Sequence, residues 1–277
     1  NTCCFIGDAK EESVNTILEM AEKKKTGTCK VLIVAGCMAQ RYKKEISEEI
    51  PEVDAILGTT SYGEIVKAVK EAQAGRHFEE YKSIDYLPGI SGKRMLTTGG
   101  HFAYLKIAEG CDKHCTYCII PKLRGSYRSV PMEDLVNEAS SLAQQGVKEL
   151  ILVAQELILV AQETTVYGKD LYGKKSLHIL LKELCKIKGI RWIRILYCYP
   201  EEIYDELIQV MKEEKKICHY LDLPIQHASD RVLKRMGRRT TRQEAGGYRW
   251  QAAQGNTGYF PSNQSDQRFS GRNPGRP

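Results

Sequence analysis

Apolar residues recur along most of this chain at the spacings of helices and strands. Residues 8–25 carry apolar side chains on one face at helical spacing, which predicts an amphipathic helix. The β-branched run 30–36 (KVLIVAG) is typical of a buried parallel strand. The next predicted elements are a helix near 40–50, a short strand at 55–57 and a helix near 62–74. The first part of the chain is therefore expected to alternate strands and helices.

From Ala103 the same alternation resumes with longer elements. The pattern predicts strands at 103–110, at the segment ELILVAQ that follows residue 148, at 190–200 and at 219–226, with helices near 131–145, 176–187 and 201–214. Repeated strand–helix units of this length favour a parallel sheet that curls into a barrel. The predicted fold class is α/β.

The chain divides into four segments by composition. We expect an N-terminal domain at 1–75, a second domain at 101–244 and, between them, a linker at 76–100, where glycine, proline and serine occur with little periodicity. The tail at 245–277 contains no Leu, Ile, Val, Met, Lys, Glu or Cys. Such a tail cannot supply core strands and is expected to be disordered, which suggests a reading-frame shift after Glu244.

The heptapeptide ELILVAQ occurs twice in tandem, at 149–155 and at 156–162. Because seven is odd and a strand has a period of two, one continuous strand would turn the second copy's side chains to the opposite faces. One copy alone is expected to occupy the strand position, and the pattern does not indicate which. The simplest interpretation is a short duplication in the gene or its assembly.

The net charge of +6 gives no strong case for direct nucleic-acid binding. The tail holds four arginines against one aspartate, a net of +3, so the other 244 residues also contribute +3, an ordinary value over that length. No segment approaches the roughly 18 apolar residues of a membrane span, and no signal peptide opens the chain. The cytoplasm is the expected location, with no membrane partner.

Ten cysteines are many for a chain expected in the cytoplasm, where disulfides rarely persist. Cys111, Cys115 and Cys118 form a C-x3-C-x2-C motif on the loop after a predicted strand. Three thiolates so spaced can hold three irons of a 4Fe-4S cluster and leave the fourth iron open. A structural zinc site would want a fourth protein ligand, and ligation by both His114 and Cys115 would be sterically awkward. The motif therefore favours the cluster over zinc.

This motif resembles the signature of radical S-adenosylmethionine (SAM) enzymes. The resemblance implies that SAM chelates the open iron through its amino and carboxylate groups, and that an electron from the cluster cleaves SAM to a 5′-deoxyadenosyl radical. Tyr117 resembles the aromatic residue that lies against the adenine in this superfamily, with ordinary packing as the alternative. By the same resemblance, the second domain is an incomplete form of a barrel with six strand–helix units.

The flanks of the motif resemble the methylthiotransferase family, in the branch that modifies a ribosomal protein. The segments that carry this resemblance are AYLKIAEGCDKHCTYCIIPKLRGSYRSVP (103–131) and DLPIQHASDRVLKRMGRR (222–239). The resemblance covers roughly residues 1–244 and implies that a methylthio group is inserted at the β-carbon of an aspartate in small-subunit ribosomal protein twelve (uS12). One SAM would supply the methyl group and another the radical. An electron donor such as flavodoxin or ferredoxin is the other implied partner.

The first residues resemble the amino-terminal domain of the same family. NTCCFIGDAKEES (1–13) and VAGCMAQRY (34–42) match a domain whose three cysteines hold a second 4Fe-4S cluster, thought to deliver sulfur. Cys3 and Cys37 match two of these ligands, and the third is expected upstream of Asn1, so this domain is expected to be partial. Cys4 stands where glycine is usual, and whether it replaces the missing ligand stays open.

Other cofactor contacts are implied at the ends of strands. Gln162 and Glu163, before TTVYG, resemble the family's short polar element that approaches the SAM amino group. Gln226 ends a predicted barrel strand, where such enzymes place cofactor or substrate contacts. An ordinary strand-end hydrogen bond is the alternative for each of these residues.

Three other functions stay open at this point. The chain could be a tRNA adenosine methylthiotransferase, or an inactive remnant of either enzyme, because missing barrel strands would leave an exposed edge and an open core. A structural zinc protein is the third alternative and would be colourless. The isolated cysteines are expected to pack as small hydrophobes: Cys29, Cys185, Cys198 and Cys218.

Overall fold

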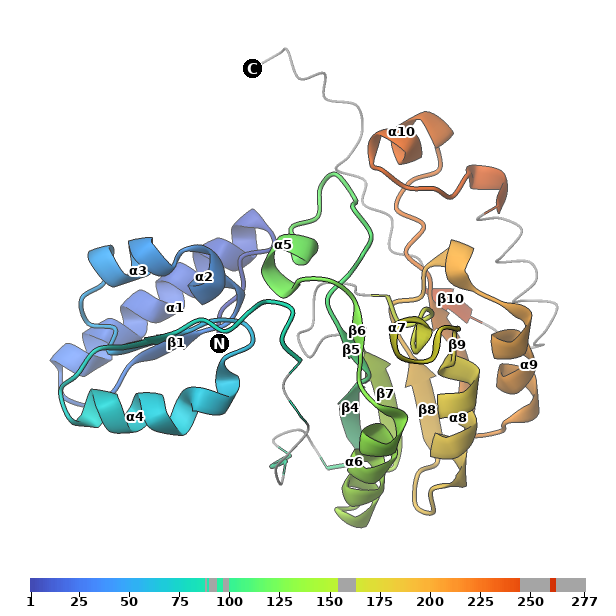
Figure 1. Ribbon diagram of the computed structural model, residues 1–277, viewed down its shortest axis with the longest axis horizontal. Coiled ribbons are helices and arrows are strands. Elements are labelled where there is room, and N and C mark those ends of the chain that lie inside the picture. The colour runs from blue at the N-terminus through green and yellow to red at the C-terminus, as the bar shows by residue number, and fades with distance from the viewer. Residues whose placement is uncertain (88, 90–93, 97–99, 154–162, 245–259, 263–277) are drawn as a thin grey trace. The chain divides into compact units, whose positions relative to one another are not determined.

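The computed structural model describes residues 1–87, 89, 94–96, 100–153, 163–244 and 260–262 (Figure 1). The chain forms two compact units, one made of Asn1–Gly89 with Cys118–Ser126 and the other of Ile90–Tyr117 with Tyr127–Pro277. Each unit alternates strands and helices around a parallel sheet, so the predicted α/β class is confirmed. None of the helices in these described ranges is long and apolar enough to cross a membrane.

The first unit is built on a three-stranded parallel sheet in the order β1-β2-β3, at Ile33–Ala35, Ala55–Leu57 and Phe78–Glu80. Its helices are α1 Gly7–Lys25, α2 Cys37–Arg41, α3 Lys43–Glu49, the 3₁₀ helix η1 Tyr62–Glu64, α4 Ile65–Gln73 and α5 Ile120–Arg124. Successive strand residues face opposite sides, so Val34 packs with Ile17 of α1 while Ala35 packs with Ala68 of α4. Figure 1 accordingly shows α1 and α4 on opposite sides of the strands.

Helix α5 belongs to this first unit although it is distant in sequence. Leu123 is 3% exposed and packs in the core formed by α1, α2 and the strands. Its carbonyl oxygen accepts a hydrogen bond of 3.0 Å from the buried hydroxyl of Thr59. These contacts fix the segment that follows the cysteine motif against the first sheet.

The second unit contains a five-stranded parallel sheet in the order β10-β9-β8-β7-β4. Its strands are β4 Phe102–Lys106, β7 Glu149–Val153, β8 Trp192–Ile195, β9 Ile217–Asp222 and β10 Phe260–Ser262. Its helices are α6 Met132–Gln144, α7 Lys169–Tyr172, α8 Leu177–Lys186, the 3₁₀ helix η2 Pro200–Glu202, α9 Asp205–Glu213 and α10 Asp230–Arg235. A two-stranded antiparallel ladder joins β5 Ala108–Glu109 to β6 Arg128–Ser129.

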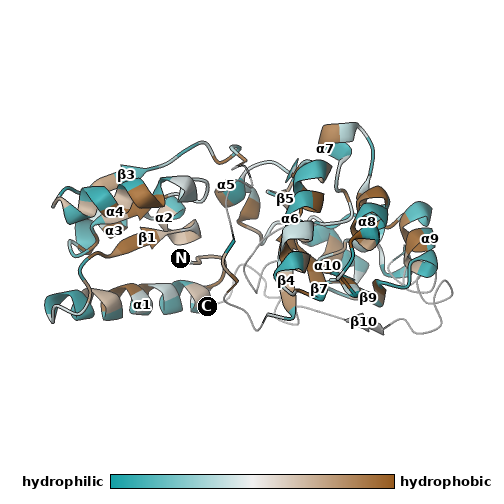
Figure 2. Cartoon of the chain, turned by 90° about the horizontal axis from the view of Figure 1, so that it is seen from below, coloured by the Kyte–Doolittle hydropathy of each residue, from teal (hydrophilic) through white to brown (hydrophobic). Residues whose placement is uncertain are grey.

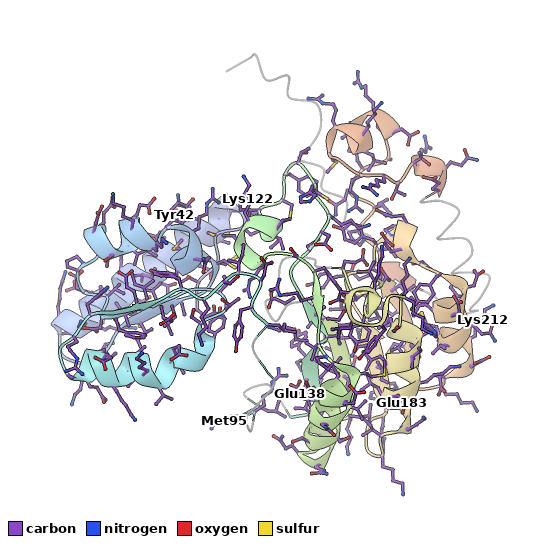
Figure 3. All side chains as sticks on the ribbon, viewed as in Figure 1. Tyr42, Met95, Lys122, Glu138, Glu183 and Lys212 are labelled. Carbon is purple, nitrogen blue, oxygen red and sulfur yellow. The ribbon has the colours of Figure 1, made fainter. Side chains whose placement is uncertain are left out.

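Helices α6, α8 and α9 connect successive strands of this sheet and bury their apolar faces. Leu135, Leu181 and Leu207, one from each helix, are fully buried. Figure 2 shows hydrophobic and hydrophilic residues on different faces of α8 and α9. The charged residues labelled on these helices in Figure 3 include Glu138, which forms an ion pair of 3.0 Å with Arg94. The burial follows the apolar periodicity that predicted each helix.

The first copy of the tandem heptapeptide forms β7. Glu149–Val153 pair with β4 on one side and with β8 on the other, and Leu150 and Leu152 are fully buried. The second copy lies outside the described residues, and the next described residue is Glu163. The register of the sheet is therefore set by the first copy.

Strand β10 corrects the expectation for the tail, and strand β3 lies where the sequence pattern indicated no element. β3 lies within the range predicted to be a linker, and β10 lies in the tail predicted to contribute no strand and to be disordered. Both pair in parallel at the end of a sheet, β3 with β2 and β10 with β9. Strand pairing uses the backbone N–H and C=O groups, and every residue except proline carries both. A short edge strand can therefore form without a run of apolar side chains. The division at 75 and 100 stays a prediction.

Matched substitutions in the two heptapeptide copies test the register. Leu150→Ala should lower the free energy of unfolding by about 2–5 kcal/mol, because it opens a cavity in a fully buried site. Leu157→Ala makes the same change in the same local sequence and is expected to have a clearly smaller effect. Urea denaturation measures both, and an equal or larger loss for Leu157→Ala would show that the second copy forms the strand.

Candidate active site

The loop that carries the cysteine motif leaves the short ladder of β5 and β6. Cys111 and Cys115 are buried, at 4% and 7% exposure. The backbone N–H of Thr116 donates to the carbonyl oxygen of Met236 at 3.0 Å, which ties the loop to the end of α10. At the adjoining Gly237 (φ +73°) an added Cβ would lie 3.1 Å from the carbonyl oxygen of His114, so close packing and backbone conformation both favour glycine there.

Cys111 and Cys115 line a cavity of about 480 Å³ within the second unit. Residues from several strand ends complete its walls, and they include Tyr127, Glu163, Tyr199 and Arg238. These four side chains carry polar groups and are buried, so they can orient a polar ligand in the cavity.

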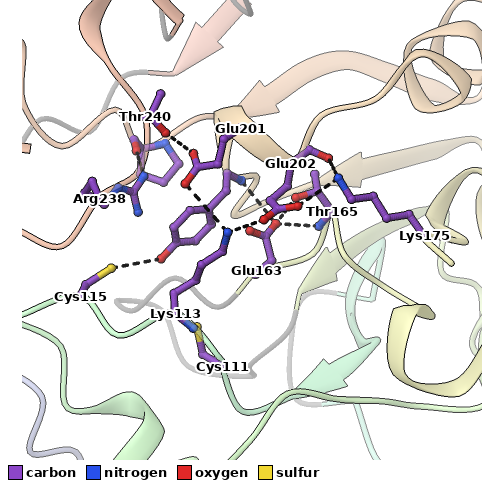
Figure 4. A network of polar contacts seen from close by, with 12 residues as sticks. Cys111, Lys113, Cys115, Glu163, Thr165, Lys175, Glu201, Glu202, Arg238 and Thr240 are labelled. Carbon is purple, nitrogen blue, oxygen red and sulfur yellow. Dashed lines mark hydrogen bonds and ion pairs between the residues drawn. The ribbon is translucent and has the colours of Figure 1, made fainter. Parts of the chain in front are cut away.

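A network of ion pairs lies along one wall of this cavity (Figure 4). The ammonium group of Lys113 forms an ion pair with Glu202 and lies 3.9 Å from Glu201. Lys175 forms a second ion pair with Glu202 at 3.0 Å. Burial would raise the pKa of Glu202, but the hydrogen bonds from Lys113 and Lys175 outweigh it and hold that pKa below its ordinary value. Glu202 is thus a carboxylate that fixes two lysines.

Glu163 is a buried carboxyl group with one oxygen unpaired. Its Oε1 accepts hydrogen bonds from the N–H and hydroxyl of Thr165 and from the N–H of Tyr199. Its Oε2 is buried and has no hydrogen-bond partner among the described residues. Burial raises the pKa of Glu163 to about 8; nearby Lys113 opposes this and Glu202 adds to it. The free oxygen can accept a hydrogen bond from a ligand in the cavity.

Tyr199 connects the cysteine loop to the opposite wall. Its hydroxyl lies 3.9 Å from Sγ of Cys115, and the guanidinium of Arg238 stacks on its ring at 4.2 Å. Burial raises the pKa of this hydroxyl far above its ordinary value, so it stays protonated and can donate toward the sulfur.

The structure brings only some of the predicted site residues to this cavity. Cys111, Cys115 and Glu163 line it, whereas the half-buried Tyr117 and Gln226 are not among its walls. Gln226 does have a left-handed backbone (φ 63°) just beyond β9. Cys118 begins the segment that belongs to the first unit. Gln162 lies outside the described residues.

The described residues do not by themselves assemble a complete metal site. No group of three His, Cys, Asp or Glu side chains among them is arranged to hold a metal ion. None of the ten cysteines, all of which lie in the described part of the chain, forms a disulfide. The assignment of Cys111, Cys115 and Cys118 to one cluster therefore stays a prediction.

The N-terminal cysteines gather at the end of β1 in the first unit. Thr2 bridges Gly36 in parallel, and the N–H of Cys37 donates to the carbonyl oxygen of Thr2 at 3.0 Å. Gly36 (φ +104°) permits this approach, because an added Cβ would lie 2.6 Å from that oxygen. The backbone thus brings Cys3 next to Cys37 by the pairing of their neighbours.

The thiol of the adjacent Cys4 interacts electrostatically with those of Cys3 and Cys37. Burial raises the pKa of its thiol to about 11, with further increases from Cys37 and Cys3 and an opposing effect of Arg41. The buried Arg124 of α5 donates from Nε to Sγ of Cys37 at 3.3 Å. Cationic donors therefore accompany the thiols of this unit.

Sequence reasoning missed Lys113, Tyr199, Arg238 and Arg124. Arg238 lies in the run RMGRR, where the neighbouring Arg235 and Arg239 are exposed and Arg238 alone is buried. Tyr199 lies near the end of the strand predicted at 190–200 and, in the structure, follows β8, and this position close to a strand end was the signal that could have identified it.

A parallel α/β sheet with a three-cysteine loop after its first strand and a buried polar cavity beside it defines the class of radical SAM proteins. Residues 105–245, just over half of the 277 residues, match the model of the Radical SAM superfamily, and residues 1–58 match that of Uncharacterized protein family UPF0004. The chain belongs to the radical SAM superfamily.

Relatives of this chain include ribosomal protein uS12 methylthiotransferases. The chain is 66% identical over 244 residues to that of Lachnoclostridium phytofermentans, covering 88% of this chain and 54% of the relative. It is 54% identical over 246 residues to that of Clostridium botulinum strain Eklund 17B, covering 88% and 53%. The chain spans about half the length of the curated relatives it matches.

Solved structures support the fold. The cobalamin-dependent SAM radical enzyme OxsB, with aqua-cobalamin and SAM bound, has a TM-score of 0.61 at 14% identity and covers 95% of this chain and 39% of its own. The radical SAM methyltransferase TsrM from Kitasatospora setae, with tryptophan and a SAM analogue bound, has a TM-score of 0.63 at 12% identity, covering 91% and 52%. At these identities the likeness concerns the fold alone.

The superfamily uses a 4Fe-4S cluster and SAM, and the chemistry of the cavity fits both. Thiols are the ligands of iron–sulfur clusters, and Cys111 and Cys115 supply two at the cavity wall. The buried unpaired atoms Glu163 Oε2 and Tyr127 Oη offer hydrogen-bonding positions to a polar ligand.

The pKa of Glu163 predicts how stability depends on pH. Below its ordinary value of 4.5 the carboxyl is neutral in both folded and unfolded chains; between 4.5 and about 8 the folded chain keeps the proton that the unfolded chain loses. Stability attributable to this group is therefore lost as pH rises through this window, by about 1.4 kcal/mol per pH unit.

Glu163→Gln, which stays neutral, should remove this loss. Urea denaturation of the metal-free wild type and variant at pH 5.5 and pH 7.5 measures it, and the variant should gain relative stability at the higher pH. A difference between the two chains that is the same at both pH values would contradict the raised pKa.

Proposed function

We propose that this chain provides the radical SAM part of a ribosomal protein uS12 methylthiotransferase, which inserts a methylthio group at the β-carbon of an aspartate of uS12. The observation that carries the proposal is the cavity on which Cys111 and Cys115 lie beside the buried, partly unpaired Glu163. The choice of substrate rests on the relatives of that name and on the flanking segments 103–131 and 222–239.

Cys111, Cys115 and Cys118 are the proposed ligands of the cluster to which SAM binds. When bound, the cluster supplies the electron that cleaves SAM. The N–H of Lys113 points to Sγ of Cys111 at 3.4 Å, and the Tyr199 hydroxyl lies near Sγ of Cys115. Hydrogen bonds to ligand sulfurs stabilise their negative charge and influence the potential of a cluster. The backbone N–H of Lys113 and the hydroxyl of Tyr199 would therefore stabilise the thiolate form of the two cysteines.

Glu163 is the proposed partner of the SAM amino group. An ammonium beside Oε2 would replace the missing partner of that oxygen and favour the ionised carboxylate. Lys113 and Lys175 hold Glu202 in place at the same wall, so that charge is balanced before the ligand arrives. Tyr117 is proposed to lie against the adenine of SAM, and Gln226 to contact the cofactor or the substrate. Gln162 is proposed to approach the SAM amino group together with Glu163.

The first unit is proposed to contribute Cys3 and Cys37, two of the three expected ligands, to the second cluster. Arg124 donates to Sγ of Cys37, which supports a thiolate at this position. A flavodoxin or ferredoxin is the proposed electron donor for the reaction.

Replacement of a motif cysteine tests the proposal. After anaerobic reconstitution with iron and sulfide, the wild-type chain should show thiolate-to-iron absorption and cleave SAM to 5′-deoxyadenosine, and mass spectrometry follows any methylthiolation of uS12. Cys115→Ala should reduce the absorption and the cleavage to background, because one of three cluster ligands is lost. Cys185→Ala on α8 replaces a half-buried cysteine outside the cavity and should retain them.

The same assays separate the other functions. Methylthiolation of tRNA adenosine instead of uS12 would favour the tRNA enzyme. A colourless chain that binds zinc at the motif would contradict the proposal. A chain that assembles its cluster and cleaves SAM but modifies neither substrate would be a remnant of the family.

A further inference from the structure

Arg238 is a buried cation that lacks partners for part of its guanidinium group. The side chain is 7% exposed, and Nη2 donates to the carbonyl oxygen of Pro224 at 3.0 Å. Nε and Nη1 are also buried, and within the described residues they have no hydrogen-bond partner. A buried charged donor left unpaired is unfavourable, so this position indicates an anion that joins it.

The guanidinium is held in one orientation before any ligand binds. It stacks on the ring of Tyr199 at 4.2 Å while Nη2 is fixed by Pro224. The wall residue Glu201 acts electrostatically on Arg238, but its carboxylate accepts a hydrogen bond from the Thr240 hydroxyl, and it also lies 3.9 Å from Lys113. Figure 4 shows Arg238 next to Thr240 and facing the cluster of charged groups. An oriented, partly unpaired arginine is well suited to a carboxylate.

The residue under Arg238 also contacts Glu163. Tyr199 carries the guanidinium on its ring and donates from its N–H to Oε1 of Glu163. One residue thus links an unpaired cationic donor to an unpaired carboxyl oxygen, and all three line the cavity. A ligand with a carboxylate and an ammonium on the same carbon has the charges that satisfy both.

We propose that Arg238 binds the carboxylate of an α-amino-acid group in this cavity, with Glu163 on its ammonium and Tyr199 as the positioning residue between them. This inference rests on the proposed function, under which the amino-acid group is the methionyl part of SAM. Arg238 then selects for an intact amino-acid group over a nucleoside that lacks it.

Two thioethers distinguish this role from a structural one. S-adenosylhomocysteine carries the amino-acid group, whereas 5′-methylthioadenosine has the same adenosine and sulfur without it. Equilibrium dialysis of the reconstituted chain gives the Kd of each. Arg238→Gln should weaken S-adenosylhomocysteine binding by roughly tenfold to a hundredfold, the usual contribution of a charged hydrogen bond, and leave 5′-methylthioadenosine unchanged.

Matched variants complete the test. Arg238→Lys keeps the positive charge and should restore part of the lost affinity, while Arg231→Gln replaces an exposed arginine of α10 outside the cavity and should bind both compounds as the wild type does. Equal weakening of both compounds by Arg238→Gln, or no weakening of either, would overturn the inference while leaving the proposed function intact. A wild-type chain with its cluster assembled that binds neither compound would overturn both.

Discussion

Parallel pairing of β4, β7, β8 and β9 is the constraint on which the cavity depends. Parallel strands all end at the same edge of a sheet, so the residues that follow them meet there. Cys111 and Cys115 come after β4 and β5, Glu163 after β7, Tyr199 after β8 and Arg238 after β9 and α10. No single segment contains the site. It exists only while the strands remain paired in order.

Two sets of charged residues at or beside the cavity differ in how completely they are paired. Lys113, Lys175 and Glu202 satisfy one another, so this part is complete within the protein. Glu163 and Arg238 keep buried atoms without partners in the described chain, each at a cost of about 1–3 kcal/mol. Packing holds them in place against this cost. The groups are therefore already oriented when a ligand enters, and little reorganisation is needed on binding.

The predictable features follow from local pattern and the unpredicted ones from packing. Apolar periodicity predicted α1, α6, α8 and the four longer strands of the second sheet. The cysteine motif indicated the radical SAM superfamily, and the model of that superfamily matches the segment that contains the motif. Resemblance indicated Glu163, which lines the cavity. Arg238 could not be told from the exposed Arg235 and Arg239, because burial of one arginine among three is decided by tertiary contacts. The strands β3 and β10 pair through backbone groups, and their sequences lack the apolar run or alternation that predicts a strand.

The use of the first heptapeptide copy in β7 bears on how this scaffold accommodates new sequence. β7 keeps its pairing with β4 and β8 although an identical heptapeptide follows directly in the chain. The alternation of inward and outward residues in β7 is set by residues 149–153 and their partners in β4 and β8, so the copy that follows leaves it unchanged. A strand paired on both sides thus keeps its register through its ladder partners, and a sequence repeat that directly follows it does not by itself alter that register.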